Sequence, residues 1–384
     1  MPSLPDLLTY SRSLIRALQE PNGAYPASPT FSAYRGYCWF RDGSFIADAM
    51  SSVGEVSSAT AFFDWCSGVI LRHQDKIERI VAAAEAGRPL SDDEMLPARF
   101  AMDGSLVQDG WWNFQLDGYG TWLWAAVEHS RRYNLDLGRW QEPIRLTVEY
   151  LVSSWSRPCY DWWEEHSEQV HVSTLGCIAA GLRAVTDTDI VAEDLAARAR
   201  ATHRAILQVL DTRGTRDGHL VKWLDSDTVD GSLSALISPL LVIDPHSPTA
   251  ESTIRSMERD LCADGGVYRF RADTFFGGGR WPLLTCFLGL ARLASGDRKG
   301  ALACLTWAAA TATPDGDLPE QVDGGLLLHP SDKQQWVDRW GPVATPLLWS
   351  HAMVLKLAAE LSESHTLQNP ITPPAGLRSD GRPA

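Results

Sequence analysis

The feature that most limits the possible folds is a repeated alternation of helical segments with longer polar connections. In about twelve stretches of the 384-residue chain, apolar residues recur with the period of an α-helix. Strand-like alternation is short and local, as at 266–270. The helices are predicted at 4–19, 42–53, 56–86, 118–132, 142–154, 168–185, 191–212, 231–242, 248–262, 281–294, 299–311 and 341–361.

The longer connections are rich in aromatic and polar residues and fall after alternate helices. Twelve helices in six pairs, with one elaborated loop per pair, predict an all-α (α/α)6 barrel whose elaborated loops, and with them any active site, gather at one end. Residues 1–365 are expected to form this barrel as a single domain, and the Pro/Gly-rich residues 366–384 are expected to form a loosely ordered tail. The six loops are expected at 39–43, 111–118, 160–165, 223–231, 267–281 and 318–340.

Charge and cysteine usage exclude several kinds of protein. The formal net charge of −14 disfavours nucleic acid and anionic membrane surfaces as partners. The seven cysteines are scattered without a CxxC spacing, which is typical of neither a disulfide framework nor a zinc site. With no leader-like N-terminus and no run of about 18 apolar residues, a cytoplasmic protein is predicted.

A cluster of tryptophans and carboxylates precedes the helix predicted at 168. In Trp162-Trp163-Glu164-Glu165 the rings can desolvate a neighbouring carboxyl group, raise its pKa and so make it a general acid. A second candidate, Glu320, lies far downstream and can reach the first only if distant loops meet. Of the two carboxyl groups, the general acid is expected to have the higher pKa, and Glu320 is expected to be ionised.

Each of these residues also has an ordinary structural interpretation. Glu164 and Glu165 could cap the following helix, Glu320 could be a solvated loop acid, and Arg41 with Asp42 could be an ion pair at a helix start. Asp117 could be an N-cap. Tryptophans are more often core than site, but Trp39, Trp111 and Trp281 fall at loop positions, whereas Trp349 lies in a helical pattern and is expected in the core.

Six ordered motifs fall in or beside the predicted loops: Trp39-Phe40-Arg41-Asp42, Gln115-Leu116-Asp117-Gly118, Tyr160 to Glu165, Arg269 to Phe276, Leu318-Pro319-Glu320-Gln321 and Pro346 to His351. Together they resemble motifs of the glucoamylases and glucodextranases of glycoside hydrolase family 15. The third motif resembles that family's Y-D-L-W-E-E, with Trp162 in place of Leu, and the fifth resembles its catalytic-base segment. In the fourth, Arg271-Ala272 stand where Pro-Glu is usual, which puts the contacts near that loop in question.

The resemblance implies a role for each motif residue. Glu164 would be the general acid and Glu320 the general base of an inverting hydrolysis, with carboxyls roughly 6.5–9.5 Å apart. No cofactor, metal or protein partner is expected, and the substrate would be a small neutral oligosaccharide. The implied substrate-binding residues are Trp39, Arg41, Asp42, Trp111, Asp117, Trp163, Glu165, Arg269 and Trp281.

The motifs together imply an exo-acting α-glucosidase that releases β-D-glucose from the non-reducing end. Isomaltose or isomalto-oligosaccharides are favoured, because the chain looks closer to the short bacterial glucosidases than to polymer-binding starch enzymes. An α-1,4-preferring glucoamylase or a trehalase remains open within the family. A sugar isomerase or epimerase on the same barrel is an alternative of another class, although such an enzyme would typically use histidine pairs. A non-catalytic carbohydrate-binding relative is a further alternative.

Overall fold

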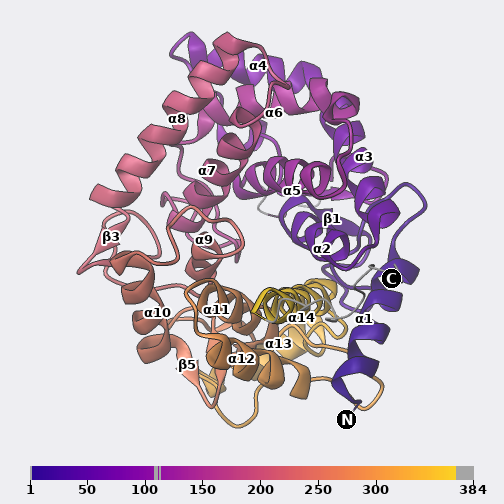
Figure 1. The fold of residues 1–384 in the computed structure, drawn as a ribbon. Helices are drawn as coiled ribbons and strands as arrows, with labels where there is room; N and C mark the ends of the chain where they lie inside the picture. The colour runs from indigo at the N-terminus through magenta and orange to yellow at the C-terminus, as the bar shows by residue number, and fades with distance from the viewer. Residues whose placement is uncertain (1, 108–110, 112–113, 369–384) are drawn as a thin grey trace, which may run out of the picture.

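Six helices form a closed inner ring in the computed structural model, which describes residues 2–107, 111 and 114–368. Each contacts the next, and the last returns to the first (Figure 1). The inner helices are α2 (Phe40–Ser52), α5 (Asp117–Tyr133), α7 (Val172–Thr186), α9 (Ser234–Ile237), α11 (Pro282–Ala294) and α14 (Leu348–Gln368).

An outer layer of helices packs around this ring. Each inner helix is preceded in the chain by an outer one, so the chain winds outer–inner six times. The outer helices are α1 (Leu4–Leu18), α3 (Val56–Arg72) with α4 (Gln74–Glu85), α6 (Gln141–Ser154), α8 (Glu193–Thr212), α10 (Pro248–Leu261) and α12 (Arg298–Ala310). This arrangement confirms the predicted (α/α)6 barrel.

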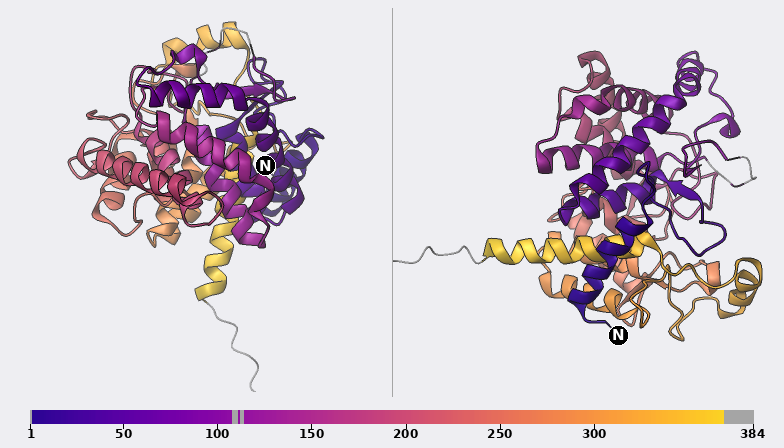
Figure 2. Two further views of the ribbon diagram at one scale, coloured as in Figure 1. Left: turned by 90° about the horizontal axis from the view of Figure 1, so that it is seen from above. Right: turned by 90° about the vertical axis from the view of Figure 1, so that its right-hand side faces the viewer.

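The long connections lie at one end of the barrel. Each runs from the C-terminus of an outer helix to the N-terminus of the next inner helix, and all six inner N-termini therefore point the same way. In the right-hand view of Figure 2 the loops gather opposite the end toward which α14 projects. The long connections fall at the six places predicted from the sequence.

Short strands and turns stiffen these loops. Two small sheets stand close to the inner helices: β1 pairs with β2, and β5, β6 and β7 form a three-stranded sheet, all antiparallel. The strands are β1 (Tyr37–Trp39), β2 (Arg99–Ala101), β3 (Thr215–Arg216), β4 (His219–Leu220), β5 (Cys262–Ala263), β6 (Gly266–Tyr268) and β7 (Arg280–Trp281). Single 3₁₀ turns occupy Asp92–Glu94, Leu137–Trp140, Gly231–Leu233, Phe275–Gly277 and Pro330–Asp332.

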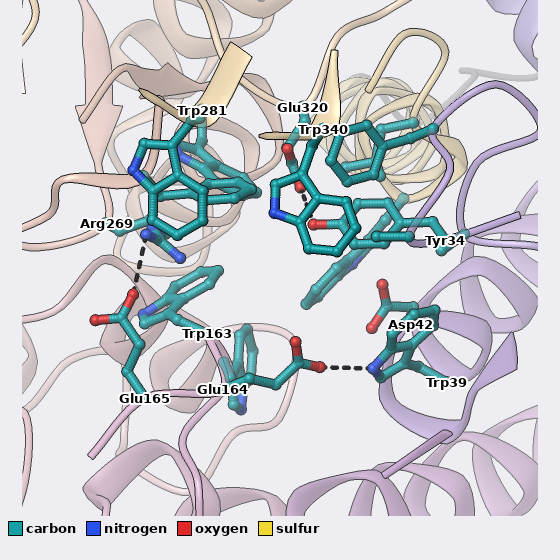
Figure 3. A pocket seen from close by; sticks show the side chains of 18 of the residues that line it. Tyr34, Trp39, Asp42, Trp163, Glu164, Glu165, Arg269, Trp281, Glu320 and Trp340 are labelled. Atoms are coloured by element: carbon teal, nitrogen blue, oxygen red, sulfur yellow. Dashed lines mark hydrogen bonds and ion pairs between the residues drawn. The ribbon is translucent and has the colours of Figure 1, made fainter. Parts of the chain in front are cut away.

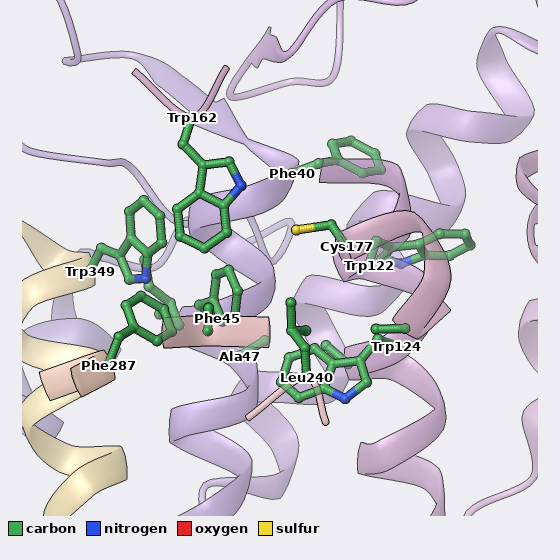
Figure 4. Close-up of a cluster of buried hydrophobic side chains, with 14 of the residues drawn as sticks. Phe40, Phe45, Ala47, Trp122, Trp124, Trp162, Cys177, Leu240, Phe287 and Trp349 are labelled. Carbon is green, nitrogen blue, oxygen red and sulfur yellow. The ribbon is translucent and has the colours of Figure 1, made fainter. Parts of the chain in front are cut away.

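Large aromatic side chains fill the interior of the ring (Figure 4). Phe45 of α2 stacks on Trp349 of α14 with ring centroids 5.5 Å apart, and it meets Phe287 of α11 edge-on at 5.1 Å. Trp124 and Trp162 contact the same Phe45 ring. All five residues are buried, so the barrel is closed beneath the loops by close-packed side chains.

Two predicted helices are shorter or broken in the structure. The helix predicted at 56–86 is divided at His73 into α3 and α4. The ring of His73 stacks on that of Phe100 in β2, with 5.6 Å between the ring centroids. The helix predicted at 231–242 ends at Ile237, because Pro239 has no N–H to donate and disfavours helical backbone at Ser238.

Two other helix starts lie later than predicted, and one helix was missed. The helix predicted from 168 begins at Val172, after a tight turn. The helix predicted from 341 begins at Leu348, because Pro342 and Pro346 keep the preceding segment extended beside residues 318–320. Within the connection assigned to 318–340, residues Lys333–Trp340 form α13, which has Trp336 and Trp340 one turn apart.

The last helix, α14, extends into the segment predicted as the C-terminal tail. Residues 366–368 belong to the last turn of α14, and the remainder of the predicted tail, 369–384, lies outside the described residues. None of the helices in the described part of the chain has the length and apolar character needed to cross a membrane. All seven cysteines are free thiols.

Two inner helices approach each other through glycine, and this contact can be tested by substitution. A Cβ on Gly120 of α5 would lie 2.4 Å from the carbonyl oxygen of Cys177 in α7. We expect Gly120→Ala to lower the free energy of unfolding by about 2–4 kcal/mol, measured by urea denaturation. Gly68→Ala on the exposed face of α3, where a Cβ meets nothing within 4 Å, should raise it by about 0.5–1 kcal/mol. Equal effects of the two substitutions would contradict this packing.

Candidate functional site

A cavity of about 440 Å³ opens among the loops, a size within the range of about 300–1,000 Å³ typical of small-molecule sites. Five of the six loops line it. The connection before α9 contributes none of the lining residues and lies behind the wall. Ten of the eleven sequence-predicted site residues line the cavity: Trp39, Arg41, Asp42, Trp111, Trp163, Glu164, Glu165, Arg269, Trp281 and Glu320.

Glu164 stands on one wall of the cavity, in the turn that precedes α7. Its Oε1 accepts a hydrogen bond of 2.7 Å from Nε1 of Trp39 (Figure 3). The residue is half-buried because its carboxyl faces the cavity, yet the surrounding walls still desolvate it. Burial raises the pKa of Glu164, while Arg41 and the Trp39 hydrogen bond act to lower it.

Glu320 faces Glu164 from the opposite wall (Figure 3). Its Oε1 accepts a hydrogen bond of 2.8 Å from the hydroxyl of Tyr34, and its backbone N–H donates to Ala344, which ties residues 318–320 to the segment before α14. The buried Oε2 has no hydrogen-bond partner among the described residues. Burial raises the pKa of Glu320 from 4.5 to about 8, although Tyr34 and Arg269 act to lower it.

The structure does not support the predicted contrast between the two carboxyl groups. The sequence interpretation expected the pKa of Glu164 to be raised relative to that of Glu320, because of the tryptophans beside Glu164. In the folded protein both groups are desolvated, and Glu320 lies deeper, at 2% exposure. Asp42 and Asp273 raise the pKa of Glu320 further, which no local pattern around Leu318-Pro319-Glu320-Gln321 could reveal.

Arg41 and Asp42 lie in the first turn of α2, at the floor of the cavity. Arg41 donates from Nη1 to Gln115 at 2.6 Å and to Asp117 at 3.1 Å, and its Nε is 3.3 Å from Asp42. Asp117, the first residue of α5, does not line the cavity, in contrast to its predicted place among the substrate-binding residues. It is 1% exposed and holds Arg41 from behind. Burial raises the pKa of Asp42 to about 6.

Arg269 links two loops on the third wall. Its guanidinium donates to Asp273, with Nε 2.8 Å from Oδ2, and its Nη2 lies 3.3 Å from Oε1 of Glu165. The rings of Trp163 and Trp281 are within 5.3 and 5.4 Å of Arg269 Cζ. Asp273 is fully buried, whereas the Glu165 side chain is 39% exposed and can reach a molecule in the cavity.

The sequence interpretation missed several residues that line the cavity. Tyr34, in the loop before β1, carried a weak signal in its Gly/Tyr-rich surroundings. Trp336 and Trp340 lie on α13, whose Trp-to-Trp spacing of four is a helix signal. Trp349, expected in the core, lines the cavity with one part of its ring while another part stacks on Phe45.

The cavity offers carboxylates, arginines and flat aromatic rings. None of the described lining residues is a histidine, and no group of three potential metal ligands occurs within the described ranges. Such a set can bind hydroxyl groups through arginine and carboxylate, stack on sugar rings, and move protons through two buried carboxyls.

The raised pKa of Glu320 has a consequence for stability that needs no substrate. Between pH 4.5 and about 8 the folded chain holds a proton that the unfolded chain has lost, so the free energy of unfolding falls as pH rises. Glu320→Gln lacks this ionisation. We expect its stability relative to wild type to increase by about 2–4 kcal/mol from pH 5 to pH 8, measured by urea denaturation. A gap independent of pH would contradict the raised pKa.

Comparisons with known proteins identify the family to which the chain belongs. The model of the glycosyl hydrolases family 15 matches residues 7–313. An isomaltose glucohydrolase from Kribbella flavida is 50% identical over 359 residues, which are 93% of this chain and 93% of that protein. A glycosidase variant solved in complex with glucose has a TM-score of 0.91 and 49% identity, and the alignment covers 94% of this chain and 97% of that chain.

A more distant structure shows the shared fold alone. A bacterial glucoamylase solved with acarbose has a TM-score of 0.71 at 18% identity, covering 93% of this chain and 55% of that chain. The family match over most of the chain and the relative at 50% identity confirm the resemblance drawn from the six motifs. The protein is a glycoside hydrolase and belongs to glycosyl hydrolase family 15.

Proposed function

We propose that the protein is an exo-acting, inverting α-glucosidase that releases β-D-glucose from isomaltose. The observation that carries this proposal is the pair of desolvated carboxyl groups, Glu164 and Glu320, on opposite walls of one cavity. Residues 1–365 would work as a single catalytic domain. A cytoplasmic location, expected from the sequence, remains a prediction.

The closed floor of the cavity supports exo action. The packed rings of Phe45, Trp349 and Phe287 lie beneath it, so a glucan chain cannot pass through the barrel. Only the end of a chain can enter. Arg41 and Asp42 at the floor would then bind hydroxyls of the terminal glucose, since a guanidinium donates and a carboxylate accepts.

The two carboxyls would divide the reaction as acid and base. Glu164, protonated, gives its proton to the glycosidic oxygen as the bond from that oxygen to C1 breaks. Glu320 acts in its ionised form, which becomes more populated as pH rises toward its pKa of about 8. It removes a proton from a water whose oxygen forms the new bond to C1 on the opposite face, which inverts the anomeric centre. The unpartnered Oε2 of Glu320 is the oxygen suited to hold that water.

The preference for an α-1,6 linkage follows the relatives. The Kribbella flavida protein, an isomaltose glucohydrolase, is similar along almost its whole length. Trp340 of α13, whose ring lies beside that of Trp111, and Trp336, one turn earlier on the same helix, would contact the second sugar and so set the linkage. Measuring kcat/KM for isomaltose, maltose and trehalose tests this: a preference for either of the last two would overturn the substrate assignment.

The roles of the two glutamates can be tested by isosteric substitution. Glu164→Gln and Glu320→Gln should each reduce kcat on isomaltose by about 10²–10⁴-fold, because each removes one proton-transfer group. Glu258→Gln is the control, since this half-buried glutamate pairs with Arg292 outside the cavity. Near-normal turnover in either cavity variant, with thermal melting unchanged, would refute the assignment.

Tyr34 provides a pH-based test of the base. Its hydrogen bond stabilises ionised Glu320 and lowers the pKa of that carboxyl. Tyr34→Phe should therefore move the ascending limb of the pH profile of kcat/KM upward by about 0.5–1 unit. A limb that stays in place would show that another group controls it.

A further inference from the structure

A buried lysine, Lys222, stands behind the wall that carries Glu164. It is 3% exposed, belongs to the connection before α9, and does not line the cavity. Its Nζ lies 2.8 Å from Oδ2 of Asp161 and 2.5 Å from Oδ2 of Asp230. Burial alone would lower the pKa of Lys222, but the two carboxylates raise it above its ordinary value, so the ammonium stays charged.

Asp161 organises the turn from which Glu164 projects. Its Oδ1 accepts the backbone N–H groups of Trp163 and Glu165, both at 2.9 Å. Its own backbone oxygen accepts the N–H of Glu164, and its N–H donates to the oxygen of Glu165. Glu164 has φ of 62°, a left-handed conformation that is uncommon for a residue with a side chain. The turn therefore depends on Asp161 keeping its position.

Asp230 holds the neighbouring side chain in the same way. Its two carboxylate oxygens accept the indole N–H of Trp163 at 3.1 and 3.0 Å. Its Oδ1 also accepts from the backbone N–H and hydroxyl of Ser232, which anchor it at the start of the inner helix α9. The backbone at Glu164, held by Asp161, and the neighbouring ring of Trp163, held by Asp230, are thus both anchored to the ammonium group of Lys222.

The two carboxylates lie close together with that cation bonded to both of them. Asp161 and Asp230 are each 2% exposed, and like charges in such a site repel strongly when water is excluded. His171, also buried, donates from Nε2 to the backbone oxygen of His166 and makes no hydrogen bond to either aspartate within the described residues. Removing the charge of Lys222 would push the carboxylates apart and move the turn.

We propose that Lys222 is a positioning residue for the hydrolytic site: through Asp161 and Asp230 it fixes the turn that presents Glu164 to the glycosidic oxygen. This inference rests on the proposed role of Glu164 as general acid. It predicts a specific defect, in which protonation of the leaving group is impaired while Glu320 on the opposite wall keeps its position.

Two substrates separate that defect from general damage. In isomaltose the leaving group is a sugar hydroxyl, which needs a proton from Glu164. In α-D-glucosyl fluoride the C1–F bond breaks with its electrons going to fluoride, which departs without a proton, while Glu320 still takes the proton from the attacking water. A displaced Glu164 should therefore slow the first reaction far more than the second.

The test compares Lys222→Met with Lys356→Met. Lys356 is an equally buried lysine, 4% exposed, whose Nζ lies 3.0 Å from both Asp48 and Glu360, away from the cavity. For Lys222→Met we expect kcat on isomaltose to fall about 100-fold or more with KM within about 3-fold, and kcat on the fluoride to fall less than about 5-fold. Lys356→Met should leave both within about 3-fold.

Equal losses on the two substrates in Lys222→Met, or no loss on either, would overturn the proposal. If Lys222→Met does not fold, Asp161→Asn decides: it keeps an oxygen for the turn but removes the charge pair, and it should show the same selective loss on isomaltose. Equal losses there would also overturn the proposal. A wild-type protein inactive on both substrates would instead refute the proposed function itself.

Discussion

The outer–inner winding of the chain is the constraint on which the rest of the structure depends. Because every inner helix follows an outer one, all six inner N-termini and their long loops must meet at one end. Aromatic packing inside the ring then closes that end from below, so the loops surround a pocket and not a channel. The winding and the packed core together therefore determine the depth of the pocket, and this depth is what admits only the end of a glucan chain.

Charge pairing in the walls determines what the two catalytic candidates can do. Arg41 pairs with Asp117, and Arg269 pairs with Asp273. The charges of these two arginines are therefore paired with carboxylates other than Glu164 and Glu320. Glu164 and Glu320 receive hydrogen bonds from neutral donors, the indole of Trp39 and the phenol of Tyr34. Burial raises both carboxyl pKa values, and it outweighs the lowering effect of Arg41 on Glu164 and of Arg269 on Glu320.

Sequence reasoning predicted the architecture well because helix periodicity and loop alternation are local signals. It also found ten residues of the cavity through motifs that keep their spacing. What it could not find depends on distant contacts: Tyr34 matters because of Glu320, Asp117 serves Arg41 instead of the cavity, and Trp349 belongs to core and cavity at once. The raised pKa of Glu320 likewise arises from burial among loops far apart in sequence.

The anomeric form of the first product tests the central claim most directly, because it reports how Glu164 and Glu320 divide the reaction. Proton NMR during the digestion of isomaltose distinguishes α- from β-glucose before the two equilibrate. The account predicts that β-glucose appears first, as required when Glu320 activates a water on the face opposite the leaving group. If α-glucose appeared first, the reaction would retain configuration, and the role given to Glu320 would be wrong.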